Sequence, residues 1–82
     1  MELENLAAEL LTLHQMMSQE AKESTHYTAI AEVAKAEEAA KANDSSKVAE
    51  SLKAAGKWAL DVATKIGVSL ATEAIKQSAG MK

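Results

Sequence analysis

The stretch from Ser45 to Ser78 repeats its apolar side chains at the spacing of an α-helix, about 100° per residue. One face of that helix would carry Val48, Leu52, Ala55, Ala59, Ile66 and Leu70. The opposite side would carry Leu60, Val68 and Ile75, next to Lys53, Lys57 and Asp61. A helix that is apolar nearly all round needs cover on both sides, so we expect a second packing surface from another copy, another protein or a membrane.

The composition favours an all-helical chain. The 82 residues include no proline, 2% aromatic residues and 18 alanines, and alanine is the strongest helix former. A core with so much alanine has little volume, and we expect tight packing or oligomerisation to complete it. The sequence therefore predicts one all-α domain over residues 1–82, a three-helix up-down arrangement with helices at about 2–23, 26–42 and 45–78.

The first predicted helix carries a heptad seam, because its apolar side chains recur at alternating spacings of three and four residues. These side chains are Leu3, Leu6, Leu10, Leu13 and Met17. Leu11 and Met16 lie off the seam and widen the buried surface. We interpret Met16 and Met17 as adaptable core residues rather than as the lining of a ligand groove.

Two turns and one break are predicted. Glu23–Thr28 loses the phase of the seam and supplies hydroxyl side chains, so it is either a turn or a bend in a continuous helix. Asn43–Ser46 is typical of a turn, with Asp44 or Ser45 as the expected N-cap of the last helix. Gly67 is the expected place for a kink or break in that helix.

Missing residue types exclude several functional classes. The chain has no cysteine, so disulfides, thiolate metal sites and cysteine nucleophiles are excluded. It has no arginine, a net charge of −3 and few aromatic side chains, a composition that argues against nucleic-acid binding. No apolar run is free enough of charge to indicate a signal peptide or a membrane span, and the expected location is cytoplasmic.

The charges divide unevenly along the chain. Residues 1–44 hold nine acidic and three lysine side chains, a net charge of −6, whereas residues 45–82 hold three acidic and six lysine side chains, a net charge of +3. Ordinary solvated surfaces can explain this division, and so can acidic helices that pack antiparallel to a basic one.

No motif for catalysis or for cofactor binding is present. Glu20, Glu23 and His26 have the spacing of helical metal ligands, but dimetal bundles need two Glu-x-x-His elements and the chain supplies one. We interpret these residues as surface residues and expect no metal. His14 lies at the edge of the seam as a packed or partner-facing histidine, and Glu37 belongs to the solvated face of the second helix. No nucleophile is bracketed by a base and an oxyanion site, so an enzyme is not expected.

Small side chains form a ridge along the last predicted helix, where Gly56 and Gly67 are expected within the helix together with Ala63 and Ala74. Such a ridge lets a neighbouring helix approach closely, from the same chain or from a second copy. Trp58 can be a partial core residue, an interface anchor or, with nearby lysines, a membrane-surface anchor. The expected interface residues are Leu3, Leu6, Leu10, Leu13, Met17, Gly56, Trp58, Leu60, Ala63, Gly67, Val68 and Ile75.

The stretch over residues 36–76, about half the chain, carries a resemblance to known sequences that rests on four short segments within it. They are Ala36–Lys41, Leu52–Trp58, Ile66–Val68 and Ile75–Lys76. Together they resemble the helical tails that end many uncharacterised bacterial multidomain proteins, some of them linked to phage defence. The resemblance implies an adaptor, tether or assembly tail rather than an active site.

We therefore predict a bacterial or phage helical interaction module that forms a homo-oligomer or binds a protein partner. Two alternatives remain at this point. One is an amphipathic protein that binds a membrane surface with its last helix. The other is a small helical inhibitor that occupies the surface of another protein.

Overall fold

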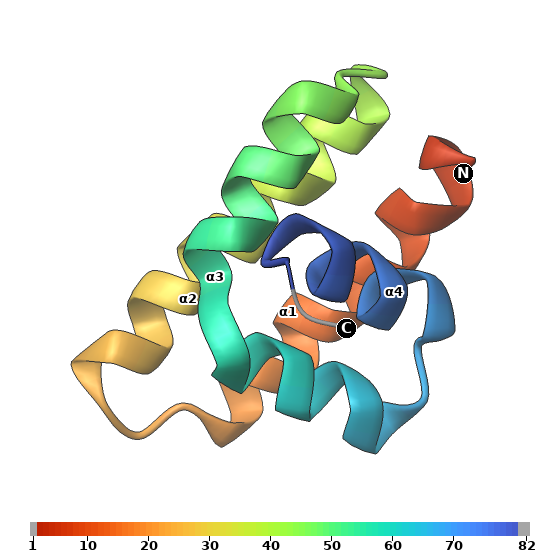
Figure 1. Ribbon diagram of the computed structural model, residues 1–82. Coiled ribbons are helices and arrows are strands. Elements are labelled where there is room, and N and C mark those ends of the chain that lie inside the picture. Colours follow the sequence, from red (N-terminus) through yellow and green to blue (C-terminus); the bar gives the residue numbers. More distant parts are fainter. Residues whose placement is uncertain (1, 81–82) are drawn as a thin grey trace.

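The computed structural model describes residues 2–80 and places them in four helices (Figure 1). They are α1 (Leu3–Glu20), α2 (Ser24–Lys41), α3 (Ser45–Ile66) and α4 (Ser69–Ser78). The predicted all-α class is confirmed, and residues 2–80 contain no strand. The predicted three-helix arrangement is wrong, because the helix expected over 45–78 stops at Ile66 and a separate helix begins at Ser69.

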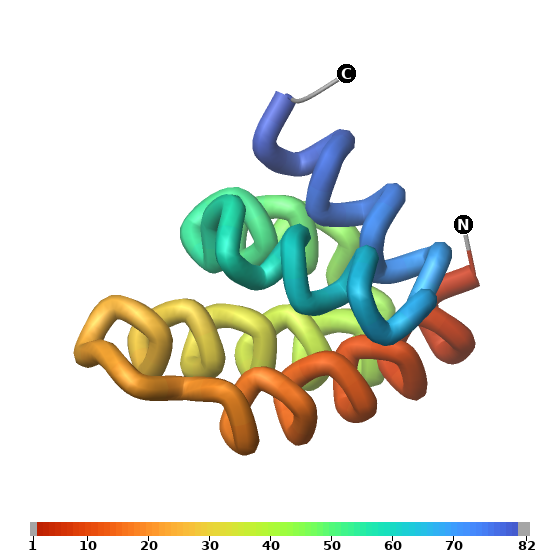
Figure 2. The backbone as a smooth tube through the Cα atoms, turned by 90° about the horizontal axis from the view of Figure 1, so that it is seen from below, coloured from red at the N-terminus to blue at the C-terminus, as the bar shows by residue number. Residues whose placement is uncertain are grey.

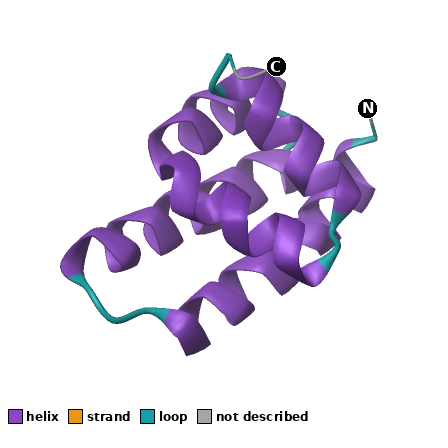
Figure 3. Cartoon of the chain, turned by 60° about the horizontal axis from the view of Figure 1, so that its bottom comes forward, coloured by secondary structure: helices purple, strands orange, loops and turns teal. Residues whose placement is uncertain are grey.

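The first three helices follow one another in antiparallel directions. α1 and α2 form a hairpin, and the first half of α3 runs back along α2 (Figure 2). α3 then changes direction and contacts α1, while α4 packs against both α3 and α1. Short loops join the helices (Figure 3), and the body measures 31 × 25 × 21 Å along its principal axes.

Two glycines divide the second half of the chain in different ways. Gly56 lies inside α3 with φ 82° and ψ −169°, a backbone conformation that is essentially restricted to glycine. Gly67 is left-handed helical, with φ 82° and ψ 25°, and its N–H donates to the Ala63 carbonyl at 3.0 Å as a helix C-cap does. The break expected at Gly67 is confirmed. The expectation that Gly56 continues a regular helix is wrong, because α3 bends there.

The core lies where the hairpin of α1 and α2 meets α3 and α4. The seam predicted on the first helix is a core seam, since Leu6, Leu10, Leu13 and Met17 are fully buried. Full burial of one such side chain stabilises the fold by about 1.5–3 kcal/mol. Alanines supply much of the remaining core, and their small side chains let the helices approach closely. They include Ala36, Ala40, Ala59, Ala63 and Ala71.

The bends also change which side chains of the last segment share a face. Leu52 and Ile75 were expected on opposite sides of one helix, yet both are fully buried in the same core. Leu60 and Val68 are half-buried and pack against the edge of that core. The second packing surface inferred for Ile75 is therefore supplied by the chain itself, because each glycine turns the helix that follows it.

Both predicted turns are present, but the first lies earlier than the predicted Glu23–Thr28 and has no hydroxyl cap, because the N-cap of α2 is Glu23 without a side-chain cap hydrogen bond. A loop over residues 21–23 separates α1 from α2, so the alternative of one continuous helix is excluded. The predicted cap at Asp44 is confirmed, because its carboxylate accepts a hydrogen bond from the Lys47 N–H at 3.2 Å. Asn43 precedes it with φ 60°, the left-handed conformation that asparagine tolerates better than most residues.

Candidate interaction surface

A three-residue polar cluster joins α1 to α2. Glu37 is a buried residue, 6% exposed, and its carboxylate oxygens lie 2.9 Å from His14 Nε2 and 2.8 Å from Lys41 Nζ. The expectation that Glu37 faces solvent is therefore wrong, because His14 of α1 and Lys41 of α2 cover it and satisfy its oxygens. The hydrogen bond and charge of Glu37 raise the pKa of the Lys41 ammonium above its ordinary value of 10.5. His14 is a packed residue that holds two helices together.

The first turn of α2 is held against α3 by an aromatic stack. The rings of His26 and Trp58 lie 3.9 Å apart and are inclined by 11°. The Lys22 N–H donates to His26 Nδ1 at 3.1 Å, and His26 Nε2 lies 3.5 Å from the Glu23 carboxylate. Both histidine nitrogens therefore have partners in the loop. Trp58 is a half-buried residue with one ring face covered by the imidazole.

The residues with metal-ligand spacing are not gathered around one point. His26 stacks on Trp58, whereas the Glu20 carboxylate accepts a hydrogen bond from Lys65 Nζ at 3.0 Å, at the end of α3. Within residues 2–80, no group of three histidine or carboxylate side chains could hold a metal ion. Glu20 and Lys65 form a link between α1 and α3.

The first helix also caps the last one. The Glu9 carboxylate of α1 accepts a hydrogen bond from the Ala71 N–H at 3.0 Å, in the first turn of α4. The N-cap residue of α4 is Val68, which has no side-chain oxygen to offer. A carboxylate from another helix satisfies an N-terminal amide and complements the positive end of the helix dipole.

The outer face of α1 carries Glu4 in its first turn and is uncharged after it. From Asn5 to the last turn, its exposed side chains carry no acid or base, and we call this set the α1 outer strip. Its members are Asn5, Ala8, Leu11, Thr12, Gln15, Ser18 and Gln19. The expectation that Leu11 widens the buried surface is wrong, because Leu11 is 39% exposed on the side of α1 that turns away from the core. Among residues 2–80, the other exposed large apolar side chain is Tyr27, at 58% on α2.

A groove runs beside this strip, between the first half of α1 and the end of α2. We call it the α1–α2 groove, and its volume is about 570 Å³. It is lined by Leu3, Glu4, Ala7, Ala8, Leu11, Ala40, Lys41 and Asn43. Alanines and leucines dominate this lining, and Glu4 and Lys41 add one charge of each sign.

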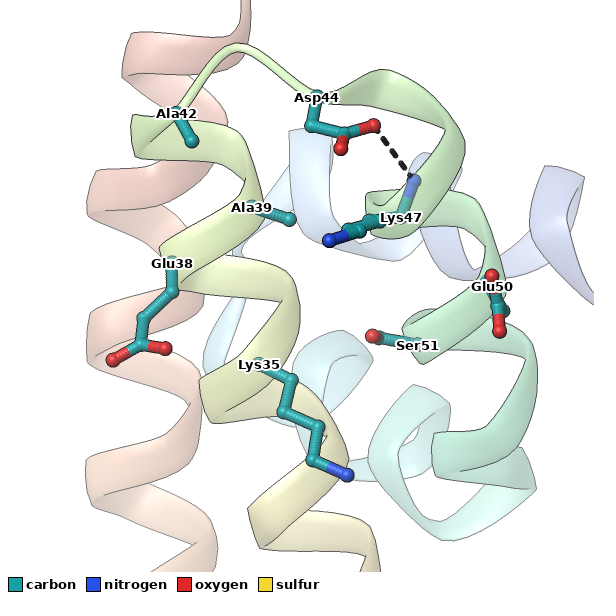
Figure 4. Close-up of a pocket in the computed structure, with 8 residues that line it drawn as sticks. All are labelled: Lys35, Glu38, Ala39, Ala42, Asp44, Lys47, Glu50 and Ser51. Atoms are coloured by element: carbon teal, nitrogen blue, oxygen red, sulfur yellow. Dashed lines mark hydrogen bonds between the residues drawn. The ribbon is translucent and has the colours of Figure 1, made fainter.

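A second groove between α2 and α3 has a different character (Figure 4). Its volume is about 430 Å³, and lysines and carboxylates are mixed along it. Asp44 is engaged in the cap of α3, and Glu38 and Glu50 extend from opposite walls. Because the charges of both signs are dispersed, this groove favours no ligand of a particular charge.

The structure distributes the expected interface residues among several locations. Fully buried inside the chain are Leu6, Leu10, Leu13, Met17, Ala63 and Ile75. At least partly exposed are Leu3, Gly56, Trp58, Leu60, Gly67 and Val68. The glycine ridge is not a continuous helix surface, because α3 bends at Gly56 and ends before Gly67. Sequence reasoning did not assign Ala8 or Leu11 to the interface. The signal that could have found them is the lack of charge on one side of α1.

Comparison with family models, with curated proteins and with solved structures gives no match for this chain. Among the described residues, the helices are too short or too polar to cross a membrane.

Proposed function

We propose that this chain is a non-enzymatic helical interaction module that assembles with other protein chains through the α1 outer strip. The observation that carries the proposal is that, beyond Glu4 in the first turn, this exposed helix face has no charged side chain and includes Leu11. Charged residues make up 26% of the chain, and the cores of protein interfaces are depleted of them. By contrast, the exposed side of α3 carries Lys53, Lys57 and Asp61, as a solvated face does.

Two of the five polar side chains of the strip already have hydrogen-bond partners within α1. The Thr12 hydroxyl donates to the Ala8 carbonyl at 3.3 Å, and the Ser18 hydroxyl donates to the His14 carbonyl at 2.9 Å. A hydroxyl that already has a partner in its own helix loses less when water is removed than an unpaired one does. The strip thus combines an exposed leucine with two hydroxyls that tolerate burial.

The resemblance to bacterial assembly tails fits the same role, and we propose a bacterial or phage setting for it. A membrane-surface role receives less support, because the candidate anchor Trp58 stacks on His26 and would have to leave it to insert. An inhibitor would use the same strip with a different protein as its occupant.

The molar mass of the chain in solution tests this proposal. We expect the mass measured by light scattering to rise above the 8.7 kDa of one chain as the concentration approaches about 1 mM. Leu11→Lys should hold the mass at that of a monomer with unchanged helix content, because it places a charge in the strip. Tyr27→Lys is the matched control and should assemble as the wild type does. A wild type that stays monomeric throughout contradicts self-assembly.

A further inference from the structure

We infer that the occupant of the α1 outer strip is the same strip of a second copy, with the two α1 helices antiparallel around a two-fold axis near Ala8. This inference rests on the proposed function and specifies its partner and geometry. In a two-fold interface, one patch must be complementary to itself. The shape and the charges of this patch both satisfy that condition.

The shape is self-complementary because the patch holds both a projection and a depression. Leu11 is 39% exposed, and the α1–α2 groove beside it is lined by small side chains, Ala7, Ala8 and Ala40 among them. In an antiparallel pair centred near Ala8, Leu11 of each copy lies over the first turns of α1 in the other copy. The two alanines at the centre allow the helix backbones to approach closely.

The charges fix the orientation. Lys41 binds Glu37, which in turn binds His14, so Lys41 lies on the His14 side of the groove, whereas Glu4 lies near the start of α1. An antiparallel arrangement therefore brings each Glu4 to the partner's Lys41. A parallel arrangement would bring Glu4 against the partner's Glu4, and like charges would repel. The antiparallel arrangement also sets the two helix dipoles in opposite directions.

The patch is short, so the dimer should be weak. It involves the outer side of one helix and the end of a second, less than the standard area of a stable protein interface. We expect an equilibrium between monomer and dimer in the micromolar range or above, with fast exchange. Covalent trapping is therefore the suitable measurement.

Because the sequence has no cysteine, an introduced cysteine is the only thiol that can form a disulfide between two copies. Ala8→Cys places a thiol near the proposed axis, where the two Cβ atoms can come within the distance of about 3.5–4.5 Å that a disulfide requires. Gln19→Cys is the matched control on the same strip. In the antiparallel pair its two copies lie about 33 Å apart, since each is eleven residues from the axis and a helix rises about 1.5 Å per residue.

Under mild oxidation at high protein concentration, we expect Ala8→Cys to form a disulfide dimer in large excess over Gln19→Cys. Efficient dimer formation by both variants would overturn the antiparallel arrangement in favour of a parallel one. Failure of Ala8→Cys to cross-link while the wild type still shows a dimeric mass would overturn this inference and leave the proposed function standing. If the wild type is monomeric, both the proposed self-assembly and this inference are rejected.

A charge variant tests the orientation independently. Glu4→Lys in the Ala8→Cys background should slow disulfide formation several-fold, because it sets a lysine against the partner's Lys41. Glu50→Lys changes the net charge equally but lies on α3, away from the α1–α2 groove, and should leave the rate unchanged. Equal rates in the two variants would overturn the predicted contact between Glu4 and the partner's Lys41. Thermal melting of both variants controls for effects on the fold.

Discussion

Residues 3–20 and residues 45–78 both repeat apolar side chains at helical spacing, but only the first segment forms one unbroken helix. In α1 the heptad positions from Leu6 to Met17 are fully buried and Leu3 packs at the edge of the core, as the spacing predicts. In the second segment, Leu52 and Ile75 were expected on opposite faces and are buried together. The spacing of apolar residues predicts a core face only while the backbone remains helical. A glycine with positive φ bends or ends the helix, so the residues after it face another direction.

The two interrupting glycines differ in a single backbone angle. Both have φ 82°, but ψ is −169° at Gly56 and 25° at Gly67. The second pair of angles lies in the left-handed helical region, which other residues can enter at a modest cost, whereas the first lies in a region used almost only by glycine. Neither position has any atom within 4 Å of where a Cβ would stand, so substitution there acts through the backbone alone.

The largest effect should come from a charge in the seam of α1. We expect Leu10→Asp to destabilise the fold by about 4 kcal/mol or more, because it buries a carboxylate and leaves a cavity. Small domains have a stability of about 5–15 kcal/mol, so cooperative melting should be nearly lost. The neighbouring Leu11→Asp, on the exposed side, should cost less than about 1 kcal/mol. Equal circular dichroism melting curves for the two variants would mean that α1 does not use its seam.

The next effect should come from Gly56→Ala. We expect a loss of about 2–3 kcal/mol in the free energy of unfolding, because alanine must either adopt a strained backbone or straighten α3. Urea denaturation with tryptophan fluorescence measures it through Trp58. Gly56→Asn should be about as damaging, since asparagine tolerates the left-handed helical region but not this one. If Gly56→Ala loses less free energy of unfolding than Gly67→Ala does, the backbone at residue 56 does not require glycine.

Gly67→Ala should have a smaller effect. The left-handed conformation costs a residue with a Cβ about 1–2 kcal/mol, and it costs asparagine less, so the free energy of unfolding should fall by that amount. The expected order of stability is wild type, Gly67→Asn and Gly67→Ala, by the same urea measurement. If asparagine offers no advantage over alanine, Gly67 does not act as a left-handed C-cap.

The cap between α1 and α4 should contribute still less. Glu9→Gln keeps an oxygen that can accept the Ala71 N–H but removes the negative charge, with an expected loss of about 0.5 kcal/mol. Glu9→Ala should cost about 1 kcal/mol, since it leaves the amide without a partner. The effect should be local, with faster hydrogen exchange at the Ala71 amide. Equal exchange in Glu9→Ala and the wild type would contradict the cap.

The smallest effect concerns Lys41 at alkaline pH. Glu37 raises the pKa of Lys41 in the folded chain above the ordinary value of 10.5. The stability from this pair is therefore fully present below pH 10.5 and is lost as the pH rises through the folded pKa. The stability difference between the wild type and Lys41→Gln should shrink over that range. A difference that does not change with pH would show that the charge of Lys41 contributes nothing.

The sequence allowed the helical class, the core seam of α1, a break between the first two helices and the cap at Asp44 to be predicted, because each depends on local spacing or side-chain chemistry. That break lies at residues 21–23, earlier than the predicted Glu23–Thr28. The bend at Gly56 could not be predicted, since alanine and lysine on both sides favour helix. The burial of Glu37 could not be predicted either, because His14, one of its two partners, comes from another helix. The α1 outer strip is defined by missing charges, and its exposure is known only once the helices are packed.

The hydrogen bond from Ala71 to Glu9 joins groups 62 residues apart in the chain, and this separation bears on the order of folding. The hairpin contacts of α1 with α2 and of α2 with α3 form between neighbours in sequence, which favours their early formation. α4 can dock on α1 only after the intervening chain has brought the two together, at the entropic cost of closing a long loop. The Ala71 amide therefore gains protection late in refolding, and its protection rate reports the final closure of the molecule.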